Sequence, residues 1–170
     1  MTPAAPPSDD LYRAVIGEPN QAFYLSYFRR ADSRGYAPIS WHWPVFCIGL
    51  FWLLYRKQYR FAAIVFGLPY LAAMLAALIE AALPGSGRPL LVLVVGAFGF
   101  LWLPLNTNGI YYRWARNEIE RVRTELPGQL DAQLRYLESR GGVNSQLPYV
   151  ILISFMVFSI LAGSFSQLGQ

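Results

Sequence analysis

Residues 40–60 read SWHWPVFCIGLFWLLYRKQYR, and the fold depends on whether this apolar stretch crosses a membrane or only enters one. Residues 43–54 carry no charge, and Arg56 and Lys57 follow almost at once. As a helix these residues would extend only about 18 Å, whereas the hydrocarbon core of a bilayer is about 30 Å thick. The stretch is therefore too short to cross as a perpendicular helix.

The rest of the chain is very apolar, and its apolar residues come in blocks. Of its 170 residues, 55% are hydrophobic and only 14% are charged, far from the composition of soluble domains. Blocks at 61–83 and 90–112 are long enough to span a bilayer, and a third at 148–167 reaches that length with Pro148 in its first turn. The sequence therefore predicts an all-α integral membrane protein with three transmembrane helices.

The basic residues indicate which side of the membrane each segment occupies. The chain has 14 Lys and Arg residues. If residues 43–54 do not cross, 13 basic residues lie on one side of the membrane and Arg88 alone lies on the other. If they cross, nine basic residues lie on one side and five on the other. Basic residues concentrate in cytoplasmic loops, so the first arrangement is favoured. We therefore expect a cytoplasmic N-terminus, a C-terminus on the far side, and residues 41–55 either re-entrant or lying in the interface.

The remaining segments complete a single membrane domain at 20–170. Residues 20–31 are expected to form an aromatic helix with Asn20 as its N-cap, either at the membrane surface or packed on the chain's own cytoplasmic region. The sequence PGSG at 84–87 predicts a turn that makes a hairpin of the first two spans. Residues 113–140 are expected to form a short cytoplasmic helical hairpin that ends at Gly141. Residues 1–19, which show no signal-like apolar run, are expected to be a disordered cytoplasmic tail.

The sequence shows no constellation that would carry catalysis. His42 is the one histidine and Cys47 the one cysteine, so a single chain cannot supply paired histidine or cysteine ligands to a metal. Neither a phosphate-binding loop nor a dinucleotide fingerprint can be found. We expect no cofactor and no enzymatic activity. The basic residues lie beside the spans, which favours anionic lipid headgroups over nucleic acid as their partners.

Three polar residues within the predicted spans form a possible intramembrane site: Glu80, Asn106 and Asn108. Glu80 lies close to the external turn, where pairing with Arg88 or contact with water is the plainer interpretation and an ion relay the alternative. The asparagines near the end of the second span need partners. They would clamp the re-entrant segment or sit at the water boundary.

Aromatic and basic residues flank the spans at the depth of the lipid headgroups, where aromatic rings and cations are favoured. These residues are the expected contacts with lipid or with partner proteins: Trp41, Trp43, Trp52, Tyr55, Arg56, Lys57, Tyr111, Tyr112 and Arg113. Small residues within the first two spans, such as Gly67 and Gly99, would allow close approach of helices.

Several motifs together resemble a domain-of-unknown-function family of small bacterial inner-membrane proteins. They are WHWPVF at 41–46, GLFWLLYRKQY at 49–59, EPNQAFYLSYFRR at 18–30 and NTNGIYYRWARNEIERV at 106–122. The family often has a histidine a few residues after the Tyr-Tyr motif, where this chain has Trp114 and Ala115. The resemblance covers about residues 20–122. It implies about three helices in a bacterial inner membrane, hence a periplasmic C-terminus, and it implies no activity.

These features favour a non-catalytic accessory, assembly or stabilising subunit of a larger membrane complex, because the cytoplasmic part is too small to act alone. The polar residues in the spans leave a small oligomeric transporter or channel as an alternative. A lipid-sensing or membrane-shaping protein is a further alternative, which rests on the aromatic and basic surface.

Overall fold

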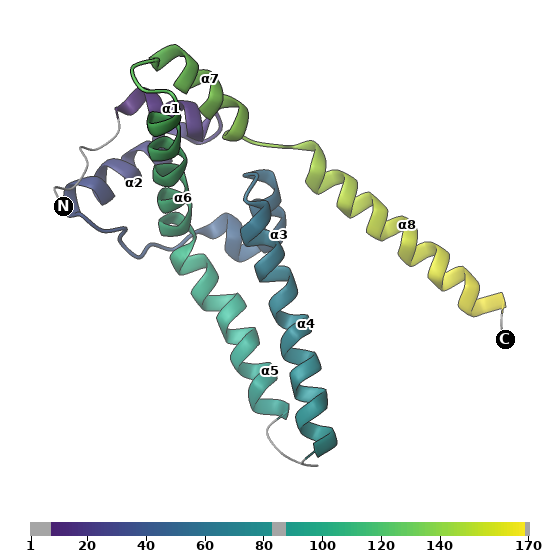
Figure 1. The fold of residues 1–170 in the computed structure, drawn as a ribbon. Helices are drawn as coiled ribbons and strands as arrows, with labels where there is room; N and C mark the ends of the chain where they lie inside the picture. Colours follow the sequence, from purple (N-terminus) through teal and green to yellow (C-terminus); the bar gives the residue numbers. More distant parts are fainter. Residues whose placement is uncertain (1–7, 83–87, 169–170) are drawn as a thin grey trace.

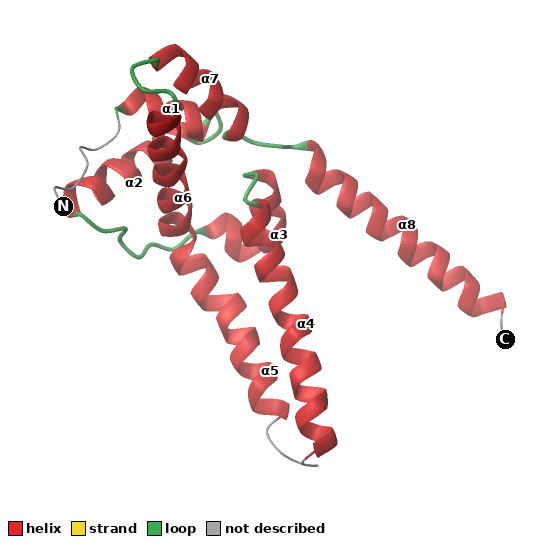
Figure 2. Ribbon diagram, in the orientation of Figure 1, coloured by secondary structure: helices red, strands yellow, loops and turns green. Residues whose placement is uncertain are grey.

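The computed structural model describes residues 8–82 and 88–168, with side chains at 8–82 and 93–160, and its secondary structure there is entirely helical (Figure 2). Two regions can be distinguished. A long apolar hairpin occupies one end of the molecule, and a bundle of shorter helices sits at the open end of that hairpin (Figure 1). The last helix leads away from both.

The hairpin pairs α4 (Tyr59–Ala82) with α5 (Arg88–Ala97). Helix α5 continues through a π-helical turn, η1 (Phe98–Trp102), into α6 (Leu103–Glu125). Pro104 has no N–H group and so cannot bond the carbonyl four residues back. Just before it, the N–H of Leu103 donates to the carbonyl of Phe98, five residues back. The proline is thus accommodated by a local π-turn within a helix that continues on both sides.

Helix α4 and the helical stretch 93–125 are long and apolar enough to cross a membrane, with 24 and 33 residues respectively. Only 11% and 28% of the residues in their most apolar windows are buried. A core helix of a soluble protein would be mostly buried, so these helices present apolar surface that suits lipid. They correspond to the predicted spans 61–83 and 90–112, although residue 83 and the predicted turn at 84–87 lie outside the described residues.

The third predicted span, 148–167, falls within α8 (Gln146–Leu168), which has 23 residues. Its described side chains from Tyr149 to Ile160 are all exposed, and it points away from the α4–α5 hairpin (Figure 1). Asn144 Oδ1 accepts from the N–H groups of Gln146 and Leu147 at 3.2 and 3.1 Å, which caps the start of the helix. That α8 crosses a membrane stays a prediction.

The short apolar stretch at 43–54 lies within α3 (Trp43–Tyr55), which is bent in the middle. Gly49 has φ +37°, a conformation that only glycine adopts without strain, and the helix changes direction there. Before the bend, Trp43 and Ile48 are exposed; after it, Trp52 and Leu53 are buried. Helix α3 lies at the open end of the hairpin rather than along it (Figure 1). The segment therefore does not form a straight helix parallel to the two long ones.

The bundle at the open end contains α1 (Asp9–Ile16), α2 (Gln21–Arg34), the second half of α6, and α7 (Leu130–Arg140). Its core includes Leu11, Val15, Phe28, Ile119 and Leu137, each at most 2% exposed. The expectation of a disordered tail at 1–19 is wrong for the helical part of this segment, because one face of α1 packs into this core. Residues 1–7 lie outside the described part of the chain.

Helix α2 corresponds to the predicted helix at 20–31, but its aromatic face does not lie at a membrane surface. Tyr24, Tyr27 and Phe28 are each at most 3% exposed and pack within the bundle, which is the second of the two placements considered above. Asn20 precedes the helix in a left-handed conformation, and its side chain makes no capping hydrogen bond. Asn20 therefore occupies the predicted N-cap position, where its carbonyl accepts from the N–H of Tyr24 at 3.2 Å, but its side chain does not cap the helix.

The predicted helical hairpin at 113–140 is present, because α6 ends at Glu125 and α7 follows after a short turn. The end of α7 touches α1 backbone to backbone. The N–H of Gly142 donates to the carbonyl of Val15 at 3.0 Å, and Gly141 leaves no room for a side chain against Val15. The C-terminal end of α7 is therefore packed directly against the backbone of α1.

Candidate functional site

Arg56 lies at the centre of the contact between the apolar region and the bundle. Its side chain is only 1% exposed, and its two terminal nitrogens donate to the carbonyls of Ile16 at 2.8 Å and Pro19 at 2.6 Å. The guanidinium carbon lies 4.5 Å from the ring centroid of Tyr24 and 5.6 Å from that of Tyr111. Carbonyl dipoles and aromatic faces replace the water that burial removes. Arg56 thus links α3 to the α1–α2 connection and to α6.

His42 forms a second buried polar contact beside Arg56. Its Nδ1 accepts from the N–H of Val45 at 3.1 Å, so in the neutral ring the proton is on Nε2, which lies 2.9 Å from the hydroxyl of Tyr24. Burial, together with the nearby charge of Arg56, lowers the pKa of His42 to about 4. A neutral His42 therefore caps α3 and holds the hydroxyl of Tyr24.

This histidine should make stability fall in acid. An unfolded histidine has a pKa of about 6.5, so between pH 6.5 and about 4 the unfolded chain binds the proton that the folded chain does not. The contribution of neutral His42 to the free energy of unfolding is then complete above pH 6.5 and is lost as the pH falls toward 4. We expect His42→Gln to remove about 2 kcal/mol of the decrease seen in the wild type across this interval. Urea unfolding at pH 7 and pH 4.5 measures this, and equal decreases in both proteins would contradict it.

Asp32, which the sequence does not single out, accepts hydrogen bonds from donors on two other helices, α1 and α6. Its carboxylate accepts from the hydroxyl of Tyr12 at 2.7 Å, from the hydroxyl of Tyr112 at 2.6 Å and from Arg116 at 3.1 Å. Burial raises the pKa of Tyr12, which keeps its hydroxyl protonated as a donor. Sequence offers only a weak sign of this role, namely an acid within a basic segment. The cluster fixes α1 and α6 to the end of α2.

The residues predicted to contact lipid or partners differ widely in solvent exposure. Trp52, Arg56, Tyr111 and Tyr112 are at most 7% exposed, so their prediction as surface contacts is wrong. They are buried because the bundle packs over this end of the hairpin. Trp43 is 66% exposed and Arg113 is exposed, whereas the other members are partly buried: Trp41, Tyr55 and Lys57.

Aromatic rings near the start of α3 form a cluster against η1. The ring centroid of Trp41 lies 5.7 Å from that of Trp43 and 5.0 Å from that of Phe46, and Phe46 lies 4.8 Å from Phe100. The first half of α3 therefore packs beside the apolar part of the long helix. An aromatic cluster of this kind suits the boundary between headgroups and acyl chains.

The possible intramembrane polar site is not assembled from the three residues proposed for it. Asn106 donates to the carbonyl of Trp102 at 2.8 Å in its own helix, while Asn108, fully buried, donates to the hydroxyl of Ser40 at 2.8 Å. Asn108 thus holds the segment that leads into α3. This agrees with the prediction that the asparagines clamp that segment rather than sit at the water boundary. Glu80 is half-buried on α4, in the part of the hairpin remote from the bundle.

A groove of about 830 Å³ lies between the start of α4, the middle of α6 and the end of α7. One part of its wall is basic and another part is apolar. We call it the basic groove. Its basic members are Lys57, Arg60, Arg121 and Arg140, and its apolar members include Phe61, Ile64, Ile110 and Trp114.

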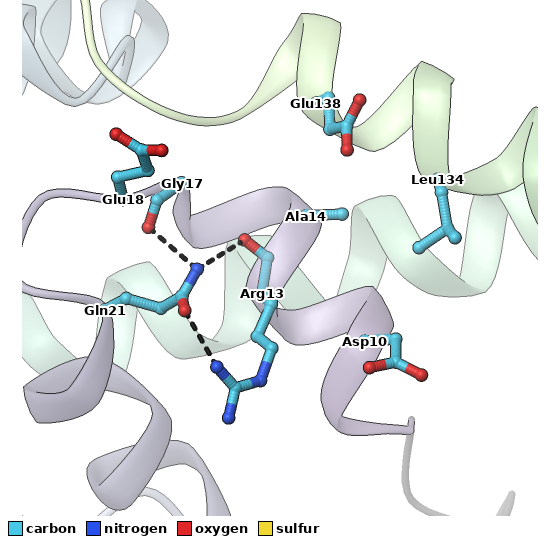
Figure 3. A pocket seen from close by; sticks show the side chains of 8 residues that line it. All are labelled: Asp10, Arg13, Ala14, Gly17, Glu18, Gln21, Leu134 and Glu138. Atoms are coloured by element: carbon cyan, nitrogen blue, oxygen red, sulfur yellow. Dashed lines mark hydrogen bonds between the residues drawn. The ribbon is translucent and has the colours of Figure 1, made fainter.

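A second, shallower depression of about 480 Å³ lies between α1, the start of α2 and α7 (Figure 3). The amide of Gln21 donates to the carbonyls of Arg13 and Gly17 at 3.3 and 3.2 Å and accepts from the guanidinium of Arg13 at 3.0 Å. These bonds close the end of α1. The depression is therefore a consequence of helix capping rather than a built binding site.

The described residues thus define a helical protein with two helices that could cross a membrane and a bundle that packs on a buried arginine. Within that part of the chain, no group of three histidine, cysteine or acidic side chains could hold a metal ion. Comparison of the chain with protein-family models, with curated proteins and with solved structures finds no match. The resemblance of residues 20–122 to a bacterial inner-membrane family therefore stays a prediction.

Proposed function

We propose that the chain is a non-catalytic accessory subunit of a bacterial inner membrane, which assembles or stabilises a larger complex by binding a transmembrane helix of another protein along α4. We further propose an orientation in which the bundle is cytoplasmic and the C-terminus is periplasmic. The positions of the basic residues support it, since Arg88 is the one Lys or Arg of the sequence placed near the far end of the hairpin.

The observation that carries the proposal is a face of small residues on α4 that the chain itself does not cover. At 100° per residue these side chains lie within about a third of the helix circumference, and all are exposed. We call it the small-residue face of α4; its small members are Ala63, Gly67, Ala73, Ala77 and Ala81, and the exposed side chains of Phe66, Tyr70 and Met74 stand between them on the same arc.

The partner of α4 within the chain lies on another side of the helix. Ala62 and Ala76 are 2% and 4% exposed, and they mark the side that packs within the chain. A side chain added at Gly67 would meet nothing within 4 Å. Transmembrane helices associate through small residues that let their backbones approach closely, because lipid provides no hydrophobic drive between them. Gly67 and the alanines leave hollows between the larger side chains of this face, so the face suits a second helix whose side chains fill those hollows.

The first test compares variants in copurification from native membranes. We expect the double substitution Gly67→Leu and Ala73→Leu to reduce the recovery of partner proteins at least tenfold, because the larger side chains keep a second helix at a distance. Mass spectrometry after extraction in mild detergent measures the recovery. The control is Ser154→Leu, which introduces the same leucine side chain at an exposed position of α8. Recovery of a lone wild-type chain, or an equal loss in the control, would overturn the proposal.

A further inference from the structure

The basic groove is lined by basic side chains in one part and by apolar side chains in another. The basic residues of its lining lie at or before the start of α4, late in α6 and at the end of α7, whereas the apolar residues lie further along α4 and earlier on α6, toward the hairpin. A ligand that fills the groove must therefore be anionic at one end and apolar at the other. This requirement separates an amphiphile from a soluble anion, which would leave the apolar part in contact with water.

The charges in the groove are available to a ligand. Glu118 is the one acid in its lining, and Arg121 donates to it at 3.2 Å, so these two charges offset each other. Lys57 donates to the carbonyl of Ser139 at 3.2 Å and keeps two further N–H groups. Arg60 and Arg140 are exposed, and neither has an ion pair among the described residues. Two guanidinium groups therefore face the groove with donors that match a phosphate.

The apolar part continues from these cations at a membrane-compatible position. Arg60 and Ile64 are four residues apart on α4 and so lie on one face, about 6 Å apart along the helix axis. Ile64 is 62% exposed, and Phe61 and Ile110 stand beside it in the groove. From Phe61 onward α4 is the apolar helix suited to lipid. An acyl chain that follows Ile64 would thus enter the hydrocarbon region while its headgroup stays near Arg60.

From this geometry we infer that the basic groove binds one anionic phospholipid, with its phosphate between Arg60 and Arg140 and an acyl chain along Phe61 and Ile64. The site is separate from the small-residue face of α4, so it goes beyond the proposed function. Lipid bound here fills the space between α4 and the end of α7. It thereby joins the hairpin to the bundle on the side that the buried Arg56 does not reach.

Native mass spectrometry of the full-length protein in detergent tests this inference. Phosphatidylglycerol and phosphatidylcholine with identical acyl chains are added in parallel, and the fraction of protein that carries one lipid is recorded. We expect phosphatidylglycerol to bind at least tenfold more tightly. Since each cation near an anionic lipid contributes about a fivefold gain in affinity, Arg60→Gln combined with Arg140→Gln should weaken that binding roughly 30-fold.

The control removes the same charge elsewhere on the bundle, with Arg30→Gln combined with Arg135→Gln, both at exposed positions. It should leave binding within about twofold of the wild type. Equal loss in both double variants would show general attraction of anionic lipid and overturn the site. Competition by an equal concentration of glycerol 3-phosphate would show a site for soluble phosphates and overturn the lipid assignment. Equal binding of both lipids to the wild type overturns the inference even if a variant fails to fold.

Discussion

Replacement of Arg56 by methionine is expected to lower the free energy of unfolding of the bundle by about 3 kcal/mol or more. The substitution keeps much of the side-chain volume but removes both donors to the carbonyls of Ile16 and Pro19. A hydrogen bond from a charged donor contributes about 1.5 to 3 kcal/mol, and the two carbonyls would stay buried without their partner. The contact of the guanidinium with the ring of Tyr24 would be lost as well.

Urea unfolding in detergent, followed by circular dichroism, measures this effect. The matched control is Arg135→Met on α7, where the arginine is exposed and has no ion pair among the described residues. A change of less than about 0.5 kcal/mol is expected for the control. If the two variants unfold at the same urea concentration, then Arg56 is not the buried link described above.

The second large effect concerns Gly141, where α7 meets α1. A Cβ atom at this position would lie within 3.0 Å of three backbone atoms of Val15. Backbone atoms cannot turn aside as a flexible side chain can, so Gly141→Ala should push the end of α7 away from α1. The hydrogen bond from Gly142 to Val15 would break with it. We expect a loss of about 2 kcal/mol or more in the free energy of unfolding.

Gly142→Ala provides the comparison for this prediction. Gly142 has φ +68°, and a Cβ atom added there would meet nothing within 4 Å, so alanine there costs about 1 kcal/mol of backbone strain but creates no clash. The difference between neighbouring positions isolates the steric effect. A larger loss for Gly142→Ala than for Gly141→Ala, measured by the same urea titration, would show that α1 and α7 do not touch as described.

Features set by length and composition could be predicted from the sequence. The apolar blocks at 61–83 and 90–112 correspond to helices with the dimensions of membrane spans, because about 20 apolar residues leave few alternatives. The length of the stretch at 43–54 predicts that it cannot form a straight span, and Gly49 supplies its bend. Pro127 and Gly141 limited the helices at 113–140 through their backbone preferences.

Features that depend on tertiary contacts could not be predicted. Arg56 looks like any basic residue at the end of a span until the carbonyls of Ile16 and Pro19, about 40 residues earlier, are placed beside it. Helix α1 has only eight residues, which is too short to be stable alone, and it exists because its apolar face is buried. The acidic start of the chain therefore suggested disorder. Tyr111 and Tyr112 look like residues of a membrane interface, because the sequence around them gives no sign that another segment buries them.

In the orientation proposed above, residues 8–42 and 113–142 lie on one side of the membrane, because the stretch at 43–54 does not cross. Cysteine labelling of intact cells tests it most directly, in a Cys47→Ala background with Arg30→Cys or Glu120→Cys at exposed positions. Ser86→Cys, between α4 and α5, is the control for access from outside. We predict that an impermeant reagent modifies the control alone, and the other two only after the membrane is permeabilised. Modification of Arg30→Cys from outside, with Glu120→Cys protected, would contradict the account.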